Sequence, residues 1–377
     1  MMRLGILGGG QLAQMMTQAA ISLGLETAIF ERKPDSPAAR ITQHHMDGDW
    51  NDPSLIFEFA SMCDAVTLEN EFVDADVLRR IASAGIPMYP TCDTLATIQD
   101  KLRQKEAMQA AGVPVPAFRG VESTADVIAA GEAMGWPLVL KARREGYDGY
   151  GNATLQAAAD IDSAWAKLGA ANGRELLVEA WVPFVRELAV MVLRGRDGEV
   201  RTYPVVETVQ QNHICHIVRA PAQVDSAVVA KTLEIAKQAV EAVDGVGVFG
   251  VEVFELADGS VLYNEMAPRP HNSGHYTIEG CVTSQFENHI RAVMGWSLGG
   301  TALVAPAAVM VNTLGSRQGA AKADAAKAAL GVQGAHVHIY QKRDVRIGRK
   351  MGHVTALGDS ITEAEAIAQN AADLVEY

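Results

Sequence analysis

The chain has 377 residues, of which 49% are hydrophobic and 20% charged, and its formal net charge is −13. This length predicts two or three domains with well-packed cores. The excess of negative charge argues against nucleic acid and anionic membrane surfaces as general partners. No stretch approaches the roughly 18 apolar residues of a membrane span. The four cysteines are widely spaced, so we expect a cytoplasmic protein with reduced thiols.

A strand, a glycine turn, a helix and a second strand open the chain and predict a βαβ unit; they cover Arg3–Leu7, Gly8–Gly10, Gln11–Leu23 and Thr27–Phe30. Gly8, Gly10 and Ala13, with Glu31 about 20 residues farther on, also match the NAD-binding fingerprint G-x-G-x-x-G/A. A glycine turn that only allows close strand–helix packing has the same pattern. From this segment alone, an NAD-dependent oxidoreductase is an open alternative.

Acidic residues follow the next predicted strand, Ala65–Leu68. Glu69 and Glu71 come directly after it, at the edge where parallel α/β sheets bind ligands. An acidic surface turn is the alternative.

A basic helix and a stiff segment come next. Thr97–Gly112 is a predicted helix that carries Lys101 and Lys105, and these cations are also what a solvated helix face would show. Val113–Pro116 alternates valine and proline, which predicts a stiff linker near a domain boundary.

A predicted strand that ends in Lys141 precedes a glycine-rich loop, Glu145–Asn152. Backbone N–H groups of such a loop can hold phosphate oxygens, and a lysine on the preceding strand adds positive charge. The Walker A pattern is absent, and an ordinary glycine hairpin is the alternative. The two features together indicate a nucleotide site.

Another predicted strand, Glu175–Glu179, runs into Ala180, Trp181 and Val182. Such a strand end can offer backbone groups to an adenine edge and apolar walls to its faces. Glu187 then lies where it can accept hydrogen bonds from ribose hydroxyls, although a solvent-facing glutamate fits equally well.

Two carboxylates are predicted to face each other in a hairpin. Asp258-Gly259 is typical of a two-residue type I′ turn between strands Val246–Leu256 and Val261–Met266. That turn pairs Glu252 with Glu265, with Cβ atoms about 5 Å apart. Facing carboxylates need a cation between them, and Mg²⁺ suits such oxygen ligands. If one glutamate points to solvent, the pairing is accidental.

Polar residues follow the hairpin and gather again near the C-terminus. Asn264, Arg269, His271, Asn272 and His275 lie on a segment stiffened by prolines, which is typical of a functional loop. Five cations within nine residues indicate a site for an anion such as a substrate phosphate, with a solvated basic turn as the alternative; they are Lys342, Arg343, Arg346, Arg349 and Lys350.

The other predicted helices cover Ala75–Ala84, Thr124–Met134, Asp160–Leu168, Ser226–Val243, Thr283–Val293 and the alanine-rich Ala320–Leu330. The other predicted strands cover Leu188–Leu193, Tyr203–Val206, Val309–Thr313 and His336–Tyr340.

These motifs together resemble the ATP-grasp superfamily, and within it the family of ATP-dependent N5-carboxyaminoimidazole ribonucleotide synthetases of purine biosynthesis. The marks of the family span nearly the whole chain; they are Gly8–Leu12, Lys141–Arg143 with Gly146–Gly149, Asn264–His275 and Gly348–His353. The resemblance implies an α/β protein: a Rossmann-like domain over 1–96, an ATP-grasp domain over 97–298 with a lid at about 115–185, and a small C-terminal α+β domain over 299–377. It also implies a homodimer and makes the NAD fingerprint a false match.

The resemblance further implies the reaction: ATP, bicarbonate and 5-aminoimidazole ribonucleotide give the carboxyamino product, ADP and phosphate through carboxyphosphate. The implied ATP-binding residues are Lys101, Lys141, Gly146, Tyr147, Asp148, Gly149, Tyr150, Gly151, Asn152, Glu179, Ala180, Trp181, Val182, Glu187, His213, Asn264 and Glu265. Glu252 and Glu265 would hold Mg²⁺, while Arg269, Asp148 and Tyr147 would be catalytic. Residues facing the ribonucleotide would be Gln11, Leu12, Glu71, His271, Asn272, Lys342, Arg349 and Lys350.

Two departures from the family pattern concern the nucleotide site. The glycine loop carries Glu145 and Tyr150 where the family more often has glycine and a basic residue. Gln210 aligns with a nucleotide-contacting histidine of the family, and His213 is the alternative for that contact.

Overall fold

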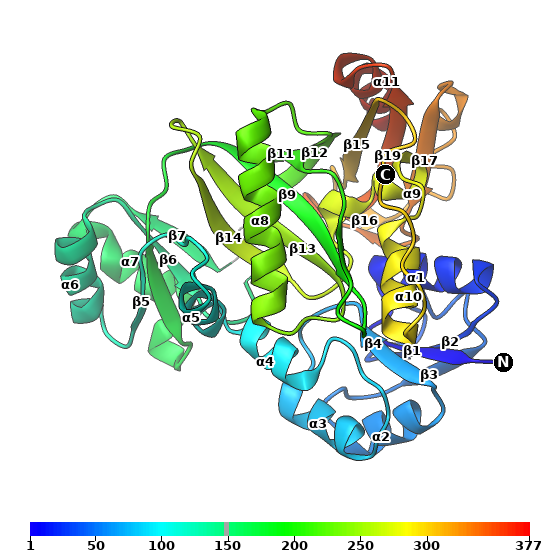
Figure 1. Cartoon of the computed structure of the whole chain (residues 1–377), viewed down its shortest axis with the longest axis horizontal. Coiled ribbons are helices and arrows are strands. Elements are labelled where there is room, and N and C mark those ends of the chain that lie inside the picture. Colours follow the sequence, from blue (N-terminus) through cyan, green and yellow to red (C-terminus); the bar gives the residue numbers. More distant parts are fainter. Residues whose placement is uncertain (147–150) are drawn as a thin grey trace.

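The computed structural model describes residues 1–146 and 151–377. Four groups of elements follow one another along the chain (Figure 1). The first is a parallel sheet in the order β3-β2-β1-β4, built from β1 (Arg3–Leu7), β2 (Glu26–Glu31), β3 (His44–Asp47) and β4 (Ala65–Leu68). Helices α1 (Gln11–Ser22), α2 (Pro53–Ser61) and α3 (Ala75–Ser83) connect and cover its strands. The predicted βαβ opening is confirmed, because β1 pairs with β2 in parallel.

The predicted helix Thr97–Gly112 is two helices, α4 (Cys92–Gln99) and α5 (Lys101–Ala110). Asp100 separates them in an extended conformation, and its carboxylate accepts from Leu102 N at 3.0 Å as the N-cap of α5. Arg143 also pairs with the Asp100 carboxylate. The break places Lys101 at the first position of α5 instead of in the middle of a long helix.

The second group is a small antiparallel sheet at the far end of the molecule (Figure 1). Its order is β5-β8-β6-β7, from β5 (Phe118–Val121), β6 (Leu138–Ala142), β7 (Asn152–Leu155) and β8 (Leu176–Ala180). Helices α6 (Thr124–Met134) and α7 (Ile161–Leu168) pack on it around a core of its own.

The third and fourth groups share one large sheet with the order β14-β13-β9-β11-β12-β15-β19-β17, and β10 pairs with β9. The third group contributes β9 (Phe184–Arg194), β10 (Val200–Thr202), β11 (Val206–Gln211), β12 (Ile214–Ala220), β13 (Gly247–Leu256) and β14 (Val261–Ala267). Helix α8 (Ser226–Ala242) packs against β9 and β13, and α10 (Gln285–Met294) packs between this sheet and α1. A short helix, α9 (Thr277–Gly280), precedes α10.

The C-terminal strands continue this sheet, because β15 (Ala307–Leu314) pairs with β12 and with β19 (Lys350–Gly358). The other C-terminal elements are β16 (Gly319–Ala320), β17 (Ala335–Ile339), β18 (Asp344–Val345) and α11 (Ile361–Asp373). The predicted helix Ala320–Leu330 is wrong: the segment forms turns and one 3₁₀ turn, Ala329–Gly331. Only Ala325 and Ala329 of this segment are buried, and a short helix needs a larger packed face to be stable.

The hairpin β13–β14 pairs Glu252 with Glu265, as predicted, but its turn and its register near the turn differ from the prediction. Its loop has three residues, since Leu256 N bonds to Ser260 O, and only Gly259 takes a positive φ (78°). The type I′ prediction is therefore wrong. Near the turn Val253 pairs with Tyr263, one residue out of the predicted register, and a β-bulge at Asn264 restores it.

In the described ranges 1–146 and 151–377, none of the helices combines the length and the apolar character needed to cross a membrane.

Candidate functional site

A cleft of about 1240 Å³ lies where the N-terminal sheet, the small sheet, the large sheet and the C-terminal strands meet. Nearly all predicted site residues that the structure describes line it: Gln11, Leu12, Glu71, Lys101, Lys141, Gly146, Asn152, Glu179, Ala180, Trp181, Val182, Glu187, His213, Glu252, Asn264, Glu265, Arg269, His271, Asn272, Lys342, Arg349 and Lys350. Gly151 is described but is not among the lining residues. Tyr147, Asp148, Gly149 and Tyr150 lie outside the described residues.

The paired glutamates have opposite pKa shifts. Burial, Glu265 and Glu187 raise the pKa of Glu252 to about 8. Burial also opposes ionisation of Glu265, but Lys101 and Lys141 hold its pKa below the usual range. Asn264 is the bulge residue next to Glu265 on β14, and its buried Oδ1 has no hydrogen-bond partner among the described residues. This site therefore holds oxygen donors and unfavourable negative charge that a hard cation would relieve.

Three lysines contact Glu265 or Glu179, another carboxylate of the cleft. Lys101 pairs with Glu265, and Lys141 Nζ donates to Glu179 Oε2 at 2.9 Å. Lys105 Nζ lies 3.3 Å from the same Glu179 oxygen. Because Lys105 is one helical turn after Lys101, both face the same side of α5.

The electrostatics of this lysine group depend on burial. Lys105 is only 2% exposed, and burial lowers its pKa to about 8. The same burial would raise the pKa of Glu179, but Lys105 and Lys141 lower it to about 2. The alternative that this helix face is solvated is wrong for Lys105. In the sequence, its spacing from Lys101 could have indicated that both lysines face the same side of the helix.

In the segment after Glu179, only part of the backbone is available to bind a ligand, because two of its N–H groups bond within the protein. Ala180 N donates to Ala117 O at 2.8 Å, and Trp181 N donates to Pro137 O at 3.2 Å. The Glu179 Oε1 atom is buried and has no partner among the described residues, while the Trp181 side chain is 45% exposed at the cleft. An unpaired acceptor beside apolar walls suits a ligand that carries an amino group.

The predicted ribose residue Glu187 also faces the cleft, and burial raises its pKa. Gln210 donates to its carboxylate, and both Gln210 and His213 line the cleft. His213 lies in the tight turn between β11 and β12, where Asn212 and His213 have positive φ of 52° and 64°. The nucleotide contact of His213, with Gln210 as the alternative, stays a prediction.

Arg269 connects two parts of the cleft. Its guanidinium donates to Glu71 through Nε at 2.7 Å and Nη2 at 3.1 Å, a bidentate pair between the segment after β14 and the segment after β4. His271 Nε2 lies 3.6 Å from Glu252 Oε1, while its Nδ1 accepts from Ser273 N at 3.4 Å. Burial, with Arg269 next, lowers the pKa of His271 to about 3, so this imidazole is neutral near pH 7.

Four of the five predicted C-terminal cations line the far side of the cleft: Lys342, Arg346, Arg349 and Lys350. Lys342 Nζ donates to Lys350 O at 2.7 Å, and burial with Arg346 nearby lowers the pKa of Arg349. Arg343 is the exception, because it pairs with Asp35 and does not line the cleft. The remaining cluster is suited to a phosphate.

The N-terminal glycine turn is filled by carboxylates of the same chain. Gly9 N donates to Glu31 Oε2 at 2.8 Å and Gly10 N donates to Glu69 Oε1 at 2.9 Å, while Ala13 N donates to Glu69 Oε2 at 3.2 Å. These are the N–H groups that a dinucleotide phosphate would need. The structure therefore gives no support to the oxidoreductase alternative.

The buried amides of Asn312 and Gln285 bond to residues that line the cleft, and both were missed from the sequence. Asn312 and Asn272 exchange hydrogen bonds of 2.9 and 2.7 Å through their side-chain amides. Gln285, at the start of α10, bonds to both backbone groups of His271. Neither residue carries a local sequence signal, because each acts through a contact with a distant segment.

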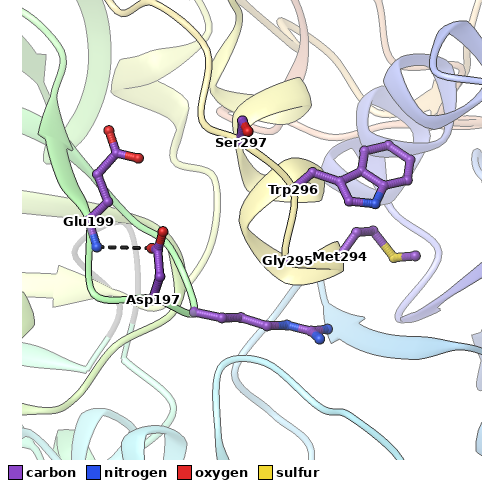
Figure 2. A pocket seen from close by; sticks show the side chains of 7 residues that line it. Asp197, Glu199, Met294, Gly295, Trp296 and Ser297 are labelled. Atoms are coloured by element: carbon purple, nitrogen blue, oxygen red, sulfur yellow. Dashed lines mark hydrogen bonds between the residues drawn. The ribbon is translucent and has the colours of Figure 1, made fainter.

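A second hollow of about 470 Å³ lies between the β9–β10 turn and the end of α10 (Figure 2). Asp197 and Glu199 face it from one side, Trp296 and Ser297 from the other, and none of the predicted site residues line it. In the described part of the chain no group of three or more histidine, cysteine, aspartate or glutamate side chains is arranged to hold a metal ion. The Glu252–Glu265 pair with an amide oxygen is thus the candidate cation site, with fewer protein carboxylates than a closed metal cage.

Known domain families match three parts of the chain. The ribonucleotide synthetase preATP-grasp domain matches residues 1–99, the ATP-grasp domain matches 106–286, and the phosphoribosylaminoimidazole carboxylase C-terminal domain matches 308–367. The domain limits predicted at 96 and 298 stay predictions.

Similarity over nearly the whole chain agrees with these domain matches. The N5-carboxyaminoimidazole ribonucleotide synthase of Synechococcus elongatus is 40% identical over 99% of this chain and 94% of its own length. The phosphoribosylaminoimidazole carboxylase of Ogataea methanolica is 44% identical over 96% of this chain, which spans 67% of that longer protein. This chain covers about two thirds of the length of the carboxylases that it matches.

Solved structures share the fold over nearly the full length. A carboxyaminoimidazole ribonucleotide synthase from Aspergillus clavatus, complexed with ATP, has a TM-score of 0.91 and 39% identity over 99% of this chain and 98% of that one. The Aspergillus clavatus enzyme in complex with ADP and 5-aminoimidazole ribonucleotide has a TM-score of 0.90 and 38% identity over the same shares of the two chains.

Proposed function

Because the chain belongs to the N5-carboxyaminoimidazole ribonucleotide synthetase family of ATP-grasp ligases, we propose that it carboxylates 5-aminoimidazole ribonucleotide with bicarbonate at the expense of ATP. The products are N5-carboxyaminoimidazole ribonucleotide, ADP and phosphate, and the pathway is purine biosynthesis. One observation supports this function most directly: a carboxylate pair with a lysine group on one side shares a cleft with a phosphate-sized cation cluster on the other.

The ATP half of the cleft is proposed to lie between the small and large sheets. Lys101 and Lys141, which pair with glutamates in the structure, exchange these partners for phosphate oxygens when the nucleotide binds. The unpaired Glu179 Oε1 accepts from the adenine amino group, and Glu187 accepts from the ribose. The predicted roles of Tyr147, Asp148, Gly149 and Tyr150 remain part of this proposal, although these residues lie outside the described ones.

Mg²⁺ fits the donor set between β13 and β14. Glu252 and Glu265 face each other, and Asn264 brings an unpaired amide oxygen to the same place. Mg²⁺ typically takes one or two protein carboxylates and completes its shell with water and nucleotide phosphates. When bound, it supplies charge neutralisation for the transferring phosphoryl group.

The ribonucleotide half is proposed to lie between the N-terminal sheet and the C-terminal cations. Lys342, Arg349 and Lys350 bind its 5′-phosphate, while Gln11, Leu12, Glu71, His271 and Asn272 contact the rest of the molecule. Arg269 lies between the two halves. There it binds bicarbonate and stabilises the negative charge that develops as carboxyphosphate forms, with Glu71 fixing its guanidinium plane.

The decisive experiment measures phosphate release from ATP with bicarbonate and 5-aminoimidazole ribonucleotide added separately and together. The proposed function requires full turnover only when both are present, with one carboxylated product per phosphate. ATP turnover that ignores the ribonucleotide, or thermal protection by NAD without ATP turnover, contradicts it. Glu265→Gln should abolish turnover while leaving the fold intact; near-normal activity would reject the metal site.

The assembly and the location belong to the same proposal. A homodimer is proposed from the family and is tested by sedimentation velocity at micromolar concentration, where a purely monomeric protein would refute it. A cytoplasmic location agrees with the four cysteines, all of which are free thiols.

A further inference from the structure

A buried glutamine holds the loop that joins the two halves of the cleft. Gln285 is the first residue of α10 and is fully buried. Its side-chain Oε1 accepts from His271 N at 2.9 Å, and its Nε2 donates to His271 O at 2.7 Å. One side chain therefore satisfies both backbone groups of the residue whose imidazole faces Glu252.

The same amide reaches His275. Gln285 Nε2 lies 3.0 Å from His275 Nδ1. The orientation of the amide is unambiguous, because a backbone N–H can only donate and a backbone C=O can only accept. Since Nε2 of glutamine is only a donor, His275 Nδ1 must accept, and the proton of this imidazole lies on Nε2.

The space around the amide is already full. A Cβ added to Gly274 would lie 2.4 Å from Gln285 Oε1 and 2.7 Å from Met191 Cγ. Gln285 N donates to Thr277 Oγ1 at 2.9 Å, and that hydroxyl donates to Gly274 O at 2.6 Å. The residues from His271 to Thr277 thus fold around one side chain.

The loop contacts both halves of the cleft. On the nucleotide side it begins after β14 and brings His271 to 3.6 Å from Glu252. On the C-terminal side Asn272 pairs with Asn312, and the His275 ring packs 5.1 Å from the ring of His353 on β19. A shift of this loop would therefore change the distance between the ATP half and the ribonucleotide half of the cleft.

We propose that Gln285 is a positioning residue: it holds the Arg269–His275 loop and the His275 tautomer so that ATP is consumed only in step with carboxylation of the ribonucleotide. This inference rests on the proposed function. Gln285 itself does not line the cleft; it acts through His271 and His275.

Three variants test the proposal. Gln285→Met keeps the length of the side chain and removes every side-chain hydrogen bond, whereas Gln285→Glu keeps the acceptor for His271 N and loses the side-chain donors. Asn288→Leu is the matched control, because Asn288 is also on α10, is also fully buried and also clamps a backbone, at Gly299 N (2.7 Å) and Gly299 O (3.4 Å). Neither Asn288 nor Gly299 lines the cleft.

The assay measures phosphate and carboxylated product together, with separate KM values for ATP and the ribonucleotide. For Gln285→Met we expect an unchanged KM for ATP, about a tenfold higher KM for the ribonucleotide, and several phosphates released per product. Gln285→Glu should regain coupling as the pH falls from 8 to 6, because only a protonated glutamate can donate to His271 O. Asn288→Leu should lower the melting temperature without altering the ratio of phosphate to product.

Two results would overturn the proposal. One is a folded Gln285→Met enzyme with the coupling ratio and KM values of the unmodified protein; the other is the same uncoupling in Asn288→Leu. If Gln285→Met does not fold, the tautomer of His275 is read from the ¹⁵N-histidine spectrum of the unmodified protein. The His275 signals are assigned by their loss in His275→Gln. A proton on Nδ1 would refute the arrangement. An unmodified protein without ribonucleotide-dependent turnover refutes instead the proposed function, and the tautomer measurement remains valid.

Discussion

Replacing Glu252 with glutamine should stabilise the ligand-free protein and inactivate it at the same time. Burial and two neighbouring carboxylates raise the pKa of Glu252 from 4.5 to about 8. The folded state therefore holds a proton that the unfolded state releases, so stability falls as the pH rises from 4.5 towards 8. Glutamine keeps the shape of the protonated acid and does not ionise, so the variant lacks this loss.

The size of the effect follows from the pKa shift. A rise from 4.5 to about 8 corresponds to an upper limit of about 5 kcal/mol. The Glu252 side chain is 23% exposed at the cleft and shares its titration with Glu265, so we expect about half of this value, ~2.5 kcal/mol. For a chain of 377 residues that corresponds to about 3 °C in melting temperature.

The assay is thermal unfolding of both proteins in EDTA between pH 5 and pH 9, with Glu241→Gln, an exposed residue of α8, as the control. The difference between Glu252→Gln and the unmodified protein should be near zero at pH 5 and reach its full size above pH 8. Mg²⁺ with ADP should then raise the melting temperature of the unmodified protein alone. A difference that does not change with pH, or a variant that keeps ATP turnover, would refute the assignment of the carboxylate pair.

Three other changes test neighbouring parts of the cleft. Arg269→Ala should lower kcat about 100-fold or more with little change in KM for ATP, because the lost charge acts on the developing phosphoryl group; a larger effect on KM than on kcat would speak against that role. Lys105→Met should raise KM for ATP about tenfold. The ionised Glu179 (pKa about 2) then has Lys141 as its remaining lysine partner and holds that lysine back from the ATP phosphates. An unchanged KM would make Lys105 purely structural. Gly250→Ala places a Cβ 2.3 Å from His271 Cβ and should reduce turnover while the far-UV circular dichroism stays unchanged, so normal turnover would show that His271 can move without consequence.

The secondary structure and the chemistry of the site could be predicted from the sequence where local signals are strong. Alternating apolar residues, glycine turns and strand-end lysines located β1, α1, β6, β13 and β14, and nearly all of the predicted site residues that the structure describes line the cleft. Family motifs then connected these separate signals. Elements with weak periodicity or few buried residues were missed, such as β3 and β19, and the alanine-rich segment was assigned a helix that does not form.

The hairpin shows how a correct pairing can follow from a wrong turn. A three-residue loop shifts the register by one position, and the bulge at Asn264 shifts it back before Glu265. Turn propensity reports only the local backbone, whereas a bulge is stabilised by what its side chains meet across the fold. The sequence therefore indicated the two partners but not the extra residue that brings Asn264 beside them.

The sequence by itself determined which groups are available: carboxylates, lysines and arginines at strand ends and in loops, in an order typical of one family. Only the tertiary structure decided their state. Glu69 fills the glycine turn that mimics an NAD site, Lys105 is a buried cation instead of a solvated one, and Gln285 holds a loop that ends ten residues before it. Desolvation and hydrogen-bond geometry depend on segments that are distant in the sequence, and no local pattern encodes them.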